Sequence, residues 1–560
     1  MEMTGARVII ECLLEQGVDT IFGYPGGAIL NVYDELYKNR DRIRHILTAH
    51  EQGAAHAADG YARSTGRVGV CFATSGPGAT NLVTGLATAY MDSSPMVAIT
   101  CNVPLNLLGR DSFQEIDIAG ITMPITKHNY IVKDVDELAD IIREAFVIAN
   151  SGRKGPVLID IPKDITAKTT DYQKMIAPPP YPKEIPPATD EAIKKASEMI
   201  NNSERPIIVA GGGVLGADAC GELMALAEKL DCPVSVTFMG TSAFPADHPN
   251  YTGMIGMHGT KASNIGVTKS DLVIAVGARF SDRVTSNASS FAVSSSILHI
   301  DIDEAEIDKN IKSDFYVVGD ARDSLARIVE LVCKKQNSDW KEEILGFKKD
   351  FPSMDNESER LNPEFIIKKI DQLTPDDAVI TTEVGQHQMW TQQFYCFKKP
   401  RTFVSSGGLG TMGFGTGAAI GSAIGNKDKK VVAVAGDGSF RMNCNELATI
   451  SDYNIPVVIV VVDNGVLGMV RQWQTLFYEK RYSETSLTSR GPNFKMLAEA
   501  YGIDGYEVFT KEEYEKALKE ALSKNAPAVI DAHICEDDFV LPMVAPGKPI
   551  KTCFSNISAL

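Results

Sequence analysis

Residues 429–464 read KKVVAVAGDGSFRMNCNELATISDYNIPVVIVVVDN, and this stretch decides the fold. Its first apolar run, Val431 to Ala435, is rich in β-branched residues and predicts a strand buried on both faces. A helical pattern follows the glycines and is broken at Asn454-Ile455-Pro456. A second apolar run, Val457 to Val462, predicts another strand. Strand, helix and strand in this order predict a right-handed crossover between two parallel neighbours.

Asp437 and Asn464 follow these two strands, 27 residues apart. The carboxyl ends of neighbouring parallel strands are where open α/β sheets bind ligands. A carboxylate and an amide oxygen suit Mg²⁺, which leaves room for substrate phosphates. Gly436 and Gly438 would allow the backbone to approach a diphosphate. Gly436-Asp437-Gly438 or Asp463-Asn464 alone could be an ordinary turn at a strand end. Their occurrence at the two ends of one crossover favours a metal–diphosphate site.

Composition limits the classes of function. The chain has 560 residues, 44% hydrophobic and 23% charged, which is typical of a soluble protein with several domains. Its net charge of −17 argues against a nucleic-acid partner or an anionic membrane. The ten scattered cysteines contain no CxxC pair and indicate reduced thiols in a cytoplasmic protein. The N-terminus does not resemble a signal peptide, and no apolar run is long enough for a membrane span.

Two segments of linker composition divide the chain. The first is proline-rich, from Ala177 to Pro187, and the second is polar, from Lys334 to Arg360, with a short helical pattern inside. The blocks are 1–176, 190–333 and 361–545, followed by a tail at 546–560. Each block alternates β-rich runs with helical patterns. We therefore predict an α/β protein with three doubly wound parallel-sheet domains.

In the first block, glycine-rich loops follow predicted strands at 23–27 and 75–78. Glu51 begins a helix of small residues, which predicts tight packing of that helix. Its carboxylate could face the ligand crevice. Alternatively, it could be a helix-start glutamate whose negative charge interacts favourably with the helix dipole. Lys163 ends the last strand and could be a surface lysine or a cation for a substrate carboxylate.

The middle block places glycines and acidic residues at successive strand ends, a nucleotide-binding layout. Residues 211–216 fit GxGxxG, but the next strand, Pro233 to Thr237, ends without the acid expected of a nicotinamide site. A spacer domain without a cofactor remains the alternative. In the third block, Met412, Met469 and Trp473 could be core residues or could lie beside the proposed metal site.

Motifs along nearly the whole chain resemble the FAD-containing acetohydroxyacid synthases (acetolactate synthases), specifically their large catalytic subunit. The matching motifs are FGYPGGAI from Phe22, HEQGAAHAADGYAR from His50, TSGPGATN from Thr74, DSFQE from Asp111, GPVLIDIPKD from Gly155, GMHG from Gly256, GARFSDRVT from Gly277, GQHQMW from Gly385, SGGLGTMGFG from Ser406, GDGSF from Gly436 and LGMVRQWQ from Leu467.

The resemblance implies a thiamine diphosphate-dependent carboligase. Such an enzyme decarboxylates pyruvate on the cofactor and transfers the hydroxyethyl carbanion to a second 2-ketoacid, pyruvate or 2-ketobutyrate, the first common step of branched-chain amino-acid biosynthesis. Glu51 would hydrogen-bond the aminopyrimidine ring, and Met412 would hold the cofactor in a folded shape. The cofactor supplies the carbanion chemistry, and the protein supplies conformation and a site poor in water.

The resemblance also implies site residues. For thiamine diphosphate these are Pro25, Glu51, Val384, Gly385, Gln386, His387, Gly410, Met412, Gly436, Asp437, Gly438, Ser439, Asn464 and Met469. Mg²⁺ would be held by Asp437, Asn464 and the carbonyl of Val466. The catalytic set would be Glu51, Gly27, Gln114, Lys163, Arg283, Met412 and Trp473. FAD would lie near Arg153, Gly211, Gly212, Gly213, Gly256, His258, Gly277, Arg279, Asp301 and Asp320.

Family precedent implies a site shared between two subunits, hence a homodimer or homotetramer, and a small regulatory subunit. The sequence departs from the family at Cys101-Asn102, Arg110 and Thr416-Gly417. Two alternative enzymes are a flavin-free catabolic acetolactate synthase and a pyruvate oxidase-like enzyme. A non-catalytic nucleotide-binding protein is the alternative from another class, and the intact set of Glu51, Asp437 and Asn464 argues against it.

Overall fold

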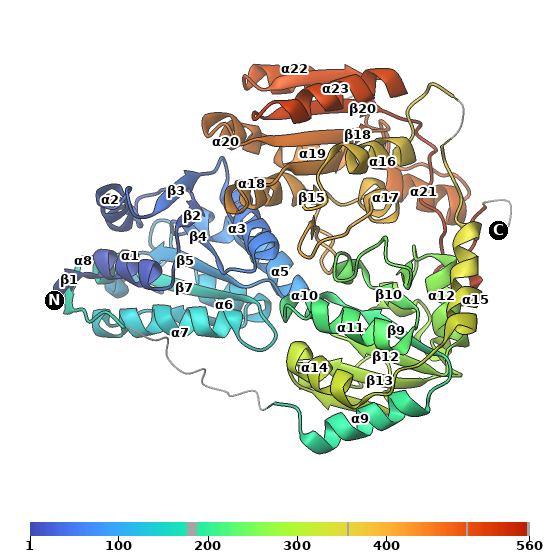
Figure 1. Ribbon diagram of the computed structural model, residues 1–560. Helices are drawn as coiled ribbons and strands as arrows, with labels where there is room; N and C mark the ends of the chain where they lie inside the picture. The colour runs from blue at the N-terminus through green and yellow to red at the C-terminus, as the bar shows by residue number, and fades with distance from the viewer. Residues whose placement is uncertain (176–186, 356–357, 489–490, 557–560) are drawn as a thin grey trace.

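The computed structural model describes residues 1–175, 187–355, 358–488 and 491–556. It contains three six-stranded parallel sheets, each with helices on both faces (Figure 1). The predicted fold class is therefore confirmed. Most of the predicted proline-rich linker lies outside the described residues. None of the described helices is both long and apolar enough to cross a bilayer.

The first sheet has the strand order β3-β2-β4-β5-β7-β6. Helix α3 (Glu51–Thr65) follows β3 on one face, and α1 (Gly5–Glu15) and α7 (Leu138–Asn150) pack against each other elsewhere in the block. A short antiparallel pair, β1 (Glu2–Thr4) with β8 (Thr169–Asp171), joins the beginning and the end of the first block. The strands are β2 (Thr20–Gly23), β3 (Arg44–Leu47), β4 (Gly69–Ala73), β5 (Met96–Asn102), β6 (His128–Ile131) and β7 (Pro156–Pro162).

The second sheet has the order β11-β10-β9-β12-β13-β14. The polar segment after it contains α15 (Ser338–Gly346), which packs on α12 (Lys261–Lys269) through buried Trp340. The tail returns to this block, where Ile550 is buried in its core. The strands are β9 (Pro206–Ala210), β10 (Val234–Val236), β11 (Tyr251–Met254), β12 (Leu272–Val276), β13 (Ser296–Asp301) and β14 (Phe315–Val318), and other helices include α9 (Asp190–Asn202), α10 (Gly212–Gly216), α11 (Cys220–Leu230) and α14 (Ala321–Leu331).

The third sheet contains the stretch that opened the sequence analysis and has the order β16-β15-β17-β18-β20-β19. Alternate residues of β17 enter two different cores, so this strand is buried on both faces as predicted. The strands are β15 (Val379–Thr382), β16 (Phe403–Val404), β17 (Val431–Gly436), β18 (Val457–Asp463), β19 (Asp504–Val508) and β20 (Ala528–His533), and the flanking helices include α16 (Pro363–Leu373), α17 (Gln386–Phe394), α18 (Gly415–Gly425), α21 (Gly468–Phe477), α22 (Phe494–Ala500) and α23 (Lys511–Ser523).

The predicted crossover is present, because β17 and β18 pair in parallel with Val434 opposite Val460. The helix between them differs from the continuous pattern in the sequence. It is split into α19 (Asp437–Asn443) and α20 (Leu447–Asp452) by one 3₁₀ turn. Asn443 leaves the helical conformation with φ −137°, and its side-chain amide donates to the carbonyl of Gly413 at 3.1 Å. This tertiary hydrogen bond accompanies the break.

The first and third blocks are joined by the contact between α3 and α18, the most extensive contact between two elements in the described chain (Figure 1). The helices approach at glycines: a β-carbon on Gly60 would overlap the carbonyl of Ala418, and one on Gly421 would overlap the carbonyl of Ala57. The tight packing predicted for the small residues of α3 is therefore confirmed, and its partner is α18.

Candidate active site

A pocket of about 80 Å³ opens at the carboxyl ends of β15, β17 and β18. Asp437 begins α19 directly after β17, and Asn464 directly follows β18, so the crossover brings them to one edge as predicted. The pocket is lined by Val384, Gly385, Gln386, His387, Trp390, Met412, Gly436, Gly438, Ser439, Val462, Asn464, Val466, Leu467, Gly468, Met469 and Val470.

The amide of Asn464 is held in one orientation. Its Nδ2 donates to Oε1 of Gln386 at 3.1 Å, while its Oδ1 accepts from the backbone N–H of Val466 at 3.3 Å. Gln386 is fixed in turn by donating to Oε1 of buried Gln472 at 2.9 Å. Because an amide oxygen has two lone pairs, Oδ1 keeps one acceptor position for a cation.

Asp437 is only 5% exposed. Burial, together with the nearby carboxylate of Asp463, raises the pKa of Asp437 well above the ordinary aspartate value. A divalent cation would offset both effects and favour the ionised form. The donors available here are oxygens from Asp437, Asn464 and the Val466 backbone, a hard set that fits Mg²⁺.

His387 lies in the pocket wall on α17, and its buried Nε2 has no hydrogen-bond partner. Burial lowers the pKa of His387 to about 3, so the ring is neutral. A β-carbon on Gly436 would lie 2.7 Å from Nδ1 of this ring, which explains the glycine there. The unpartnered nitrogen offers a hydrogen bond to a polar ligand, so the pocket fits a diphosphate.

Met412 and Met469 contribute to the pocket wall beside Trp390 and Leu467, which the sequence analysis did not single out. Gly410 is outside the wall and lies near Val384. Trp473 is also outside it: this half-buried residue packs edge-to-face on Phe477 at 5.4 Å between ring centres. It is therefore not a fully buried core residue.

The predicted residues of the first block gather at the carboxyl edge of its own sheet. Glu51 is 8% exposed and accepts a hydrogen bond from Nδ2 of Asn81 at 3.0 Å. Lys163 Nζ donates to the carbonyl of Gly27 at 3.0 Å, and Pro25 lies in the same loop after β2. Gln114 has φ 57° and packs against Gly76. No residue of this group lines the pocket of its own chain in the described structure.

Glu446 was missed by the sequence analysis. This residue is fully buried, and its two oxygens accept hydrogen bonds from the backbone N–H groups of Ala49 at 3.2 Å and His50 at 3.0 Å. It also accepts from the hydroxyl of Thr449. Its two backbone partners lie nearly 400 residues away in the chain, so no local sequence signal could have identified this contact.

The predicted FAD residues of the middle block fall at successive strand ends. Gly211 and Gly213 donate backbone hydrogen bonds to Val276 and Gly277, at 2.8 and 3.1 Å, where β9 and β12 end. Gly212 lies between them, Arg279 follows β12, and Asp301 ends β13. Asp320 caps α14 through Oδ1, which accepts from the N–H groups of Arg322 and Asp323.

The other three predicted FAD residues come from the end of β11 in the same sheet and from the first block. Gly256 and His258 follow β11, and Nδ1 of His258 is buried without a partner. Arg153 reaches from the first block to Glu306 at 2.8 Å. Arg283, predicted for substrate, has a 63% exposed side chain that contacts the sulfur of Met257.

The departures from the family pattern lie in different structural settings. Asn102 Nδ2 donates to buried Asp160 at 2.8 Å, and Cys101 is fully buried. Thr416 donates its backbone N–H to Glu383, whereas Gly417 packs against His56 across the α3–α18 contact. Arg110 is exposed in the loop where Glu115 caps three backbone N–H groups.

Comparison with known proteins adds an independent result. Three family models match: the N-terminal binding domain of thiamine pyrophosphate enzymes at residues 3–121, their central domain at 193–328, and their C-terminal binding domain at 383–532. The chain is 49% identical to a probable acetolactate synthase large subunit of Methanocaldococcus jannaschii, covering 97% of this chain and 94% of that one. It is 47% identical to the acetolactate synthase large subunit of Corynebacterium glutamicum, over 98% and 89%. The corresponding protein of Parasynechococcus marenigrum is 46% identical, over 98% and 90%.

Proposed function

Because this chain belongs to the acetolactate synthase large subunits, within the thiamine pyrophosphate enzymes, we propose that it decarboxylates pyruvate and joins the two-carbon unit to a second 2-ketoacid, pyruvate or 2-ketobutyrate. The observation that carries the proposal is the convergence of Asp437 and Asn464 beside a pocket walled by glycines and His387. That arrangement suits a diphosphate held through Mg²⁺.

In this proposal Asp437, Asn464 and the carbonyl of Val466 hold Mg²⁺, while His387, Gly436, Gly438 and Ser439 face the diphosphate. When bound, the thiazolium ring of thiamine diphosphate supplies the electron sink for decarboxylation and carbon–carbon bond formation. Gln386 and Gln472 keep the Asn464 oxygen directed to the cation. Met412 and Met469 form apolar walls that exclude water from the reacting carbon.

Glu51 exchanges a proton with the aminopyrimidine ring of a cofactor held by another chain. Support for this comes from the absence of Glu51 from its own chain's pocket wall. Glu446 of the same chain holds the helix start that carries Glu51. The functional unit is then a homodimer or a dimer of dimers. Pro25, Gly27, Gln114 and Lys163 line the same shared site from the first block.

Arg283 binds the carboxylate of the acceptor ketoacid, for which a guanidinium is suited by its paired donors. Trp473 limits the size of the acceptor. FAD binds at the strand ends of the middle block, with Gly211, Gly213 and Gly277 allowing close backbone approach.

The names of the relatives, which are large subunits, support a small regulatory partner. The ten free thiols support a cytoplasmic location.

The test is product analysis with purified chain, thiamine diphosphate, Mg²⁺ and FAD. Pyruvate alone should give acetolactate, and added 2-ketobutyrate should give acetohydroxybutyrate in competition with it. Hydrogen peroxide as the main product would instead identify an oxidase. Full activity in protein without flavin absorbance would indicate the flavin-free enzyme, and no carboligation under any of these conditions would refute the proposal.

A further inference from the structure

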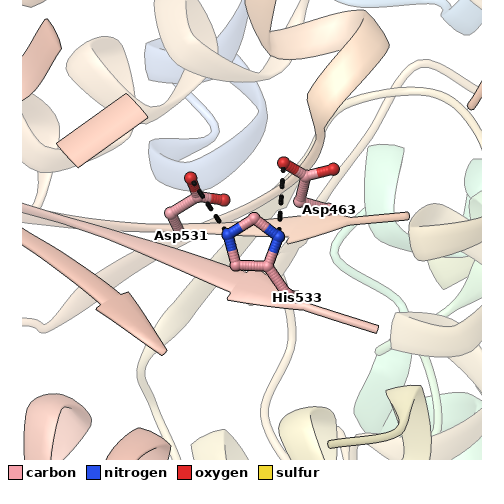
Figure 2. Close-up of side chains that lie close together, drawn as sticks. All are labelled: Asp463, Asp531 and His533. Carbon is pink, nitrogen blue, oxygen red and sulfur yellow. Dashed lines mark ion pairs between the residues drawn. The ribbon is translucent and has the colours of Figure 1, made fainter. Parts of the chain in front are cut away.

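Three neighbouring strands of the third sheet bring acidic residues and a histidine to one face. Asp463 on β18 is opposite His533 on β20, and Glu507 on β19 is opposite Asp531 on β20. Alternate residues of a strand point to the same face, so Asp531 and His533 share it with both partners. Figure 2 shows the carboxylates of Asp463 and Asp531 directed toward the two different ring nitrogens of His533.

The two aspartate oxygens lie beyond hydrogen-bond distance of the His533 ring, and each lies beside a different ring nitrogen. His533 Nδ1 lies 3.8 Å from Oδ2 of Asp463, and Nε2 lies 3.7 Å from Oδ2 of Asp531. One ligand atom from each of these three residues lies within 4.8 Å of the others. Ligands at about 2.0–2.2 Å from a tetrahedral cation are themselves roughly 3.4 Å apart. Because one cation can bind only one of the two ring nitrogens, closing the set requires the aspartate beside the other nitrogen to rotate toward the one that binds.

The buried carboxylate of Asp531 has an unsatisfied atom. Asp531 is 2% exposed, and its Oδ1 has no hydrogen-bond partner. The Nε2 of His533 beside it is likewise unpartnered. Among the described residues, no lysine or arginine forms an ion pair with Asp463, Asp531 or Glu507. Buried charges in proteins are paired or coordinate metals, and the only basic partner of these carboxylates among the described residues is the imidazole of His533.

The surroundings hold the side chains in place and leave an entry. The ring of His533 stacks on Phe509 with 4.5 Å between centres and 4° between planes. Oδ1 of Asp463 accepts from the backbone N–H of Gly465 at 2.8 Å, which leaves Oδ2 for the cation. The side chain of His533 is 30% exposed, so an ion can reach the group from solvent.

We propose that Asp463, Asp531 and His533 form a binding site for one divalent transition-metal cation of the Zn²⁺ type, with Glu507 close enough to provide a fourth ligand. An imidazole nitrogen beside carboxylate oxygens favours Zn²⁺, whereas Mg²⁺ prefers oxygen alone. The site does not depend on the proposed carboligase activity. It would fix the end of β18 one residue before Asn464.

The test is calorimetric titration of the full chain with Zn²⁺, in saturating thiamine diphosphate and Mg²⁺ so that the Asp437–Asn464 position is filled. The wild type should bind one Zn²⁺ per chain that His533→Ala binds about tenfold or more weakly. His248→Ala is the matched control, because His248 lies 3.5 Å from a single carboxylate, Glu228, and should bind as the wild type does. Equal binding by wild type and His533→Ala, or loss in Asp437→Asn instead, would overturn the proposal.

Two further measurements guard against a variant that fails to fold. Asp531→Asn preserves side-chain size, and Zn²⁺ should raise the thermal midpoint of the wild type but not of this variant. Anomalous diffraction at the zinc edge on wild-type crystals needs no variant at all. A peak between Asp463, Asp531 and His533 would support the site, and crystals soaked in Zn²⁺ without such a peak would refute it.

Discussion

Glu446 accepts a hydrogen bond from the backbone N–H of His50, the residue that precedes Glu51. This contact joins the segment after Asp437 to the helix start that carries the proposed proton-exchanging carboxylate. A β-carbon on Gly53 would overlap the Glu446 carboxylate, so the glycine is required for this approach. The position of Glu51 is therefore set by a residue of the third block of the same chain.

Replacing Glu446 by Gln should impair the placement of Glu51. One acceptor oxygen becomes an NH₂ group that faces a backbone N–H, leaving a buried donor unpaired at a cost of about 1–3 kcal/mol. We expect a lower kcat with little change in KM for pyruvate, and a lower thermal midpoint. Thr449→Val is the control: it removes the hydroxyl donor to Glu446 but leaves both backbone N–H contacts. Equal loss of kcat in both variants would contradict a positioning role.

Replacing Glu51 by Gln should leave the cofactor bound and abolish most turnover. Asn81 can still hydrogen-bond the amide oxygen, so the fold should tolerate the change, but an amide cannot exchange the proton. Thiamine diphosphate affinity and the rate of acetolactate formation should be measured together. The control variant Glu342→Gln, at an exposed position of α15, should match the wild type in both, and near-normal turnover by Glu51→Gln would refute the proton-exchange role.

Replacing Gly421 by Ala should destabilise the joint between the first and third blocks. The new methyl group would overlap the carbonyl of Ala57, and overpacking of this kind typically costs about 1–3 kcal/mol or more. We expect a thermal midpoint lower by several degrees. Gly216→Ala is the matched control, since no atom lies within 4 Å of its added carbon. Similar midpoints for the two variants would show that the α3–α18 contact is adaptable.

Glu383 and Glu364 should affect the pH dependence of stability with opposite signs. Burial raises the pKa of Glu383 to about 7, although backbone N–H groups of Gly413 and Thr416 oppose the shift. A carboxyl group with a raised folded pKa stabilises fully below its unfolded pKa of 4.5 and loses that contribution as pH rises toward 7. The free energy of unfolding should therefore fall less between about pH 5 and 7 in Glu383→Gln than in the wild type, and the difference should be at most ~3 kcal/mol.

For Glu364, burial acts to raise the pKa, but Lys368 and the backbone N–H groups of Met354 and Asp355 outweigh it and lower the pKa. Its contribution is present above the unfolded pKa and is lost as pH falls through the folded pKa. Glu364→Gln should thus lose stability at neutral pH and approach the wild type in acid. Urea midpoints for both variants across pH 4–8 would check this, and parallel pH profiles would contradict it.

The crossover, the three parallel sheets and the pocket edge could be predicted because their signals are local. The runs around Val431 and Val457 encode buried strands, and strand ends in a parallel sheet meet at one edge. The break in the helix at Asn443 could not be predicted, since its side chain bonds to Gly413 thirty residues away.

Long-range partners account for the other omissions. Glu446 and Asp531 carry no local pattern: their importance arises only when distant strands and helices pack beside them. Trp390 and Leu467 lie within recognised motifs, yet only the fold shows that they form the pocket wall.

The location of Glu51 outside its own chain's pocket has a consequence for mixtures of inactive chains. If each catalytic centre combines position 51 of one chain with position 437 of another, a Glu51→Gln chain paired with an Asp437→Asn chain rebuilds one intact centre of the two. Random mixing of the two inactive chains in equal amounts makes half of the dimers mixed, and each mixed dimer has one intact centre of two. The mixture should then recover about a quarter of wild-type activity. Centres confined to single chains could show no such complementation.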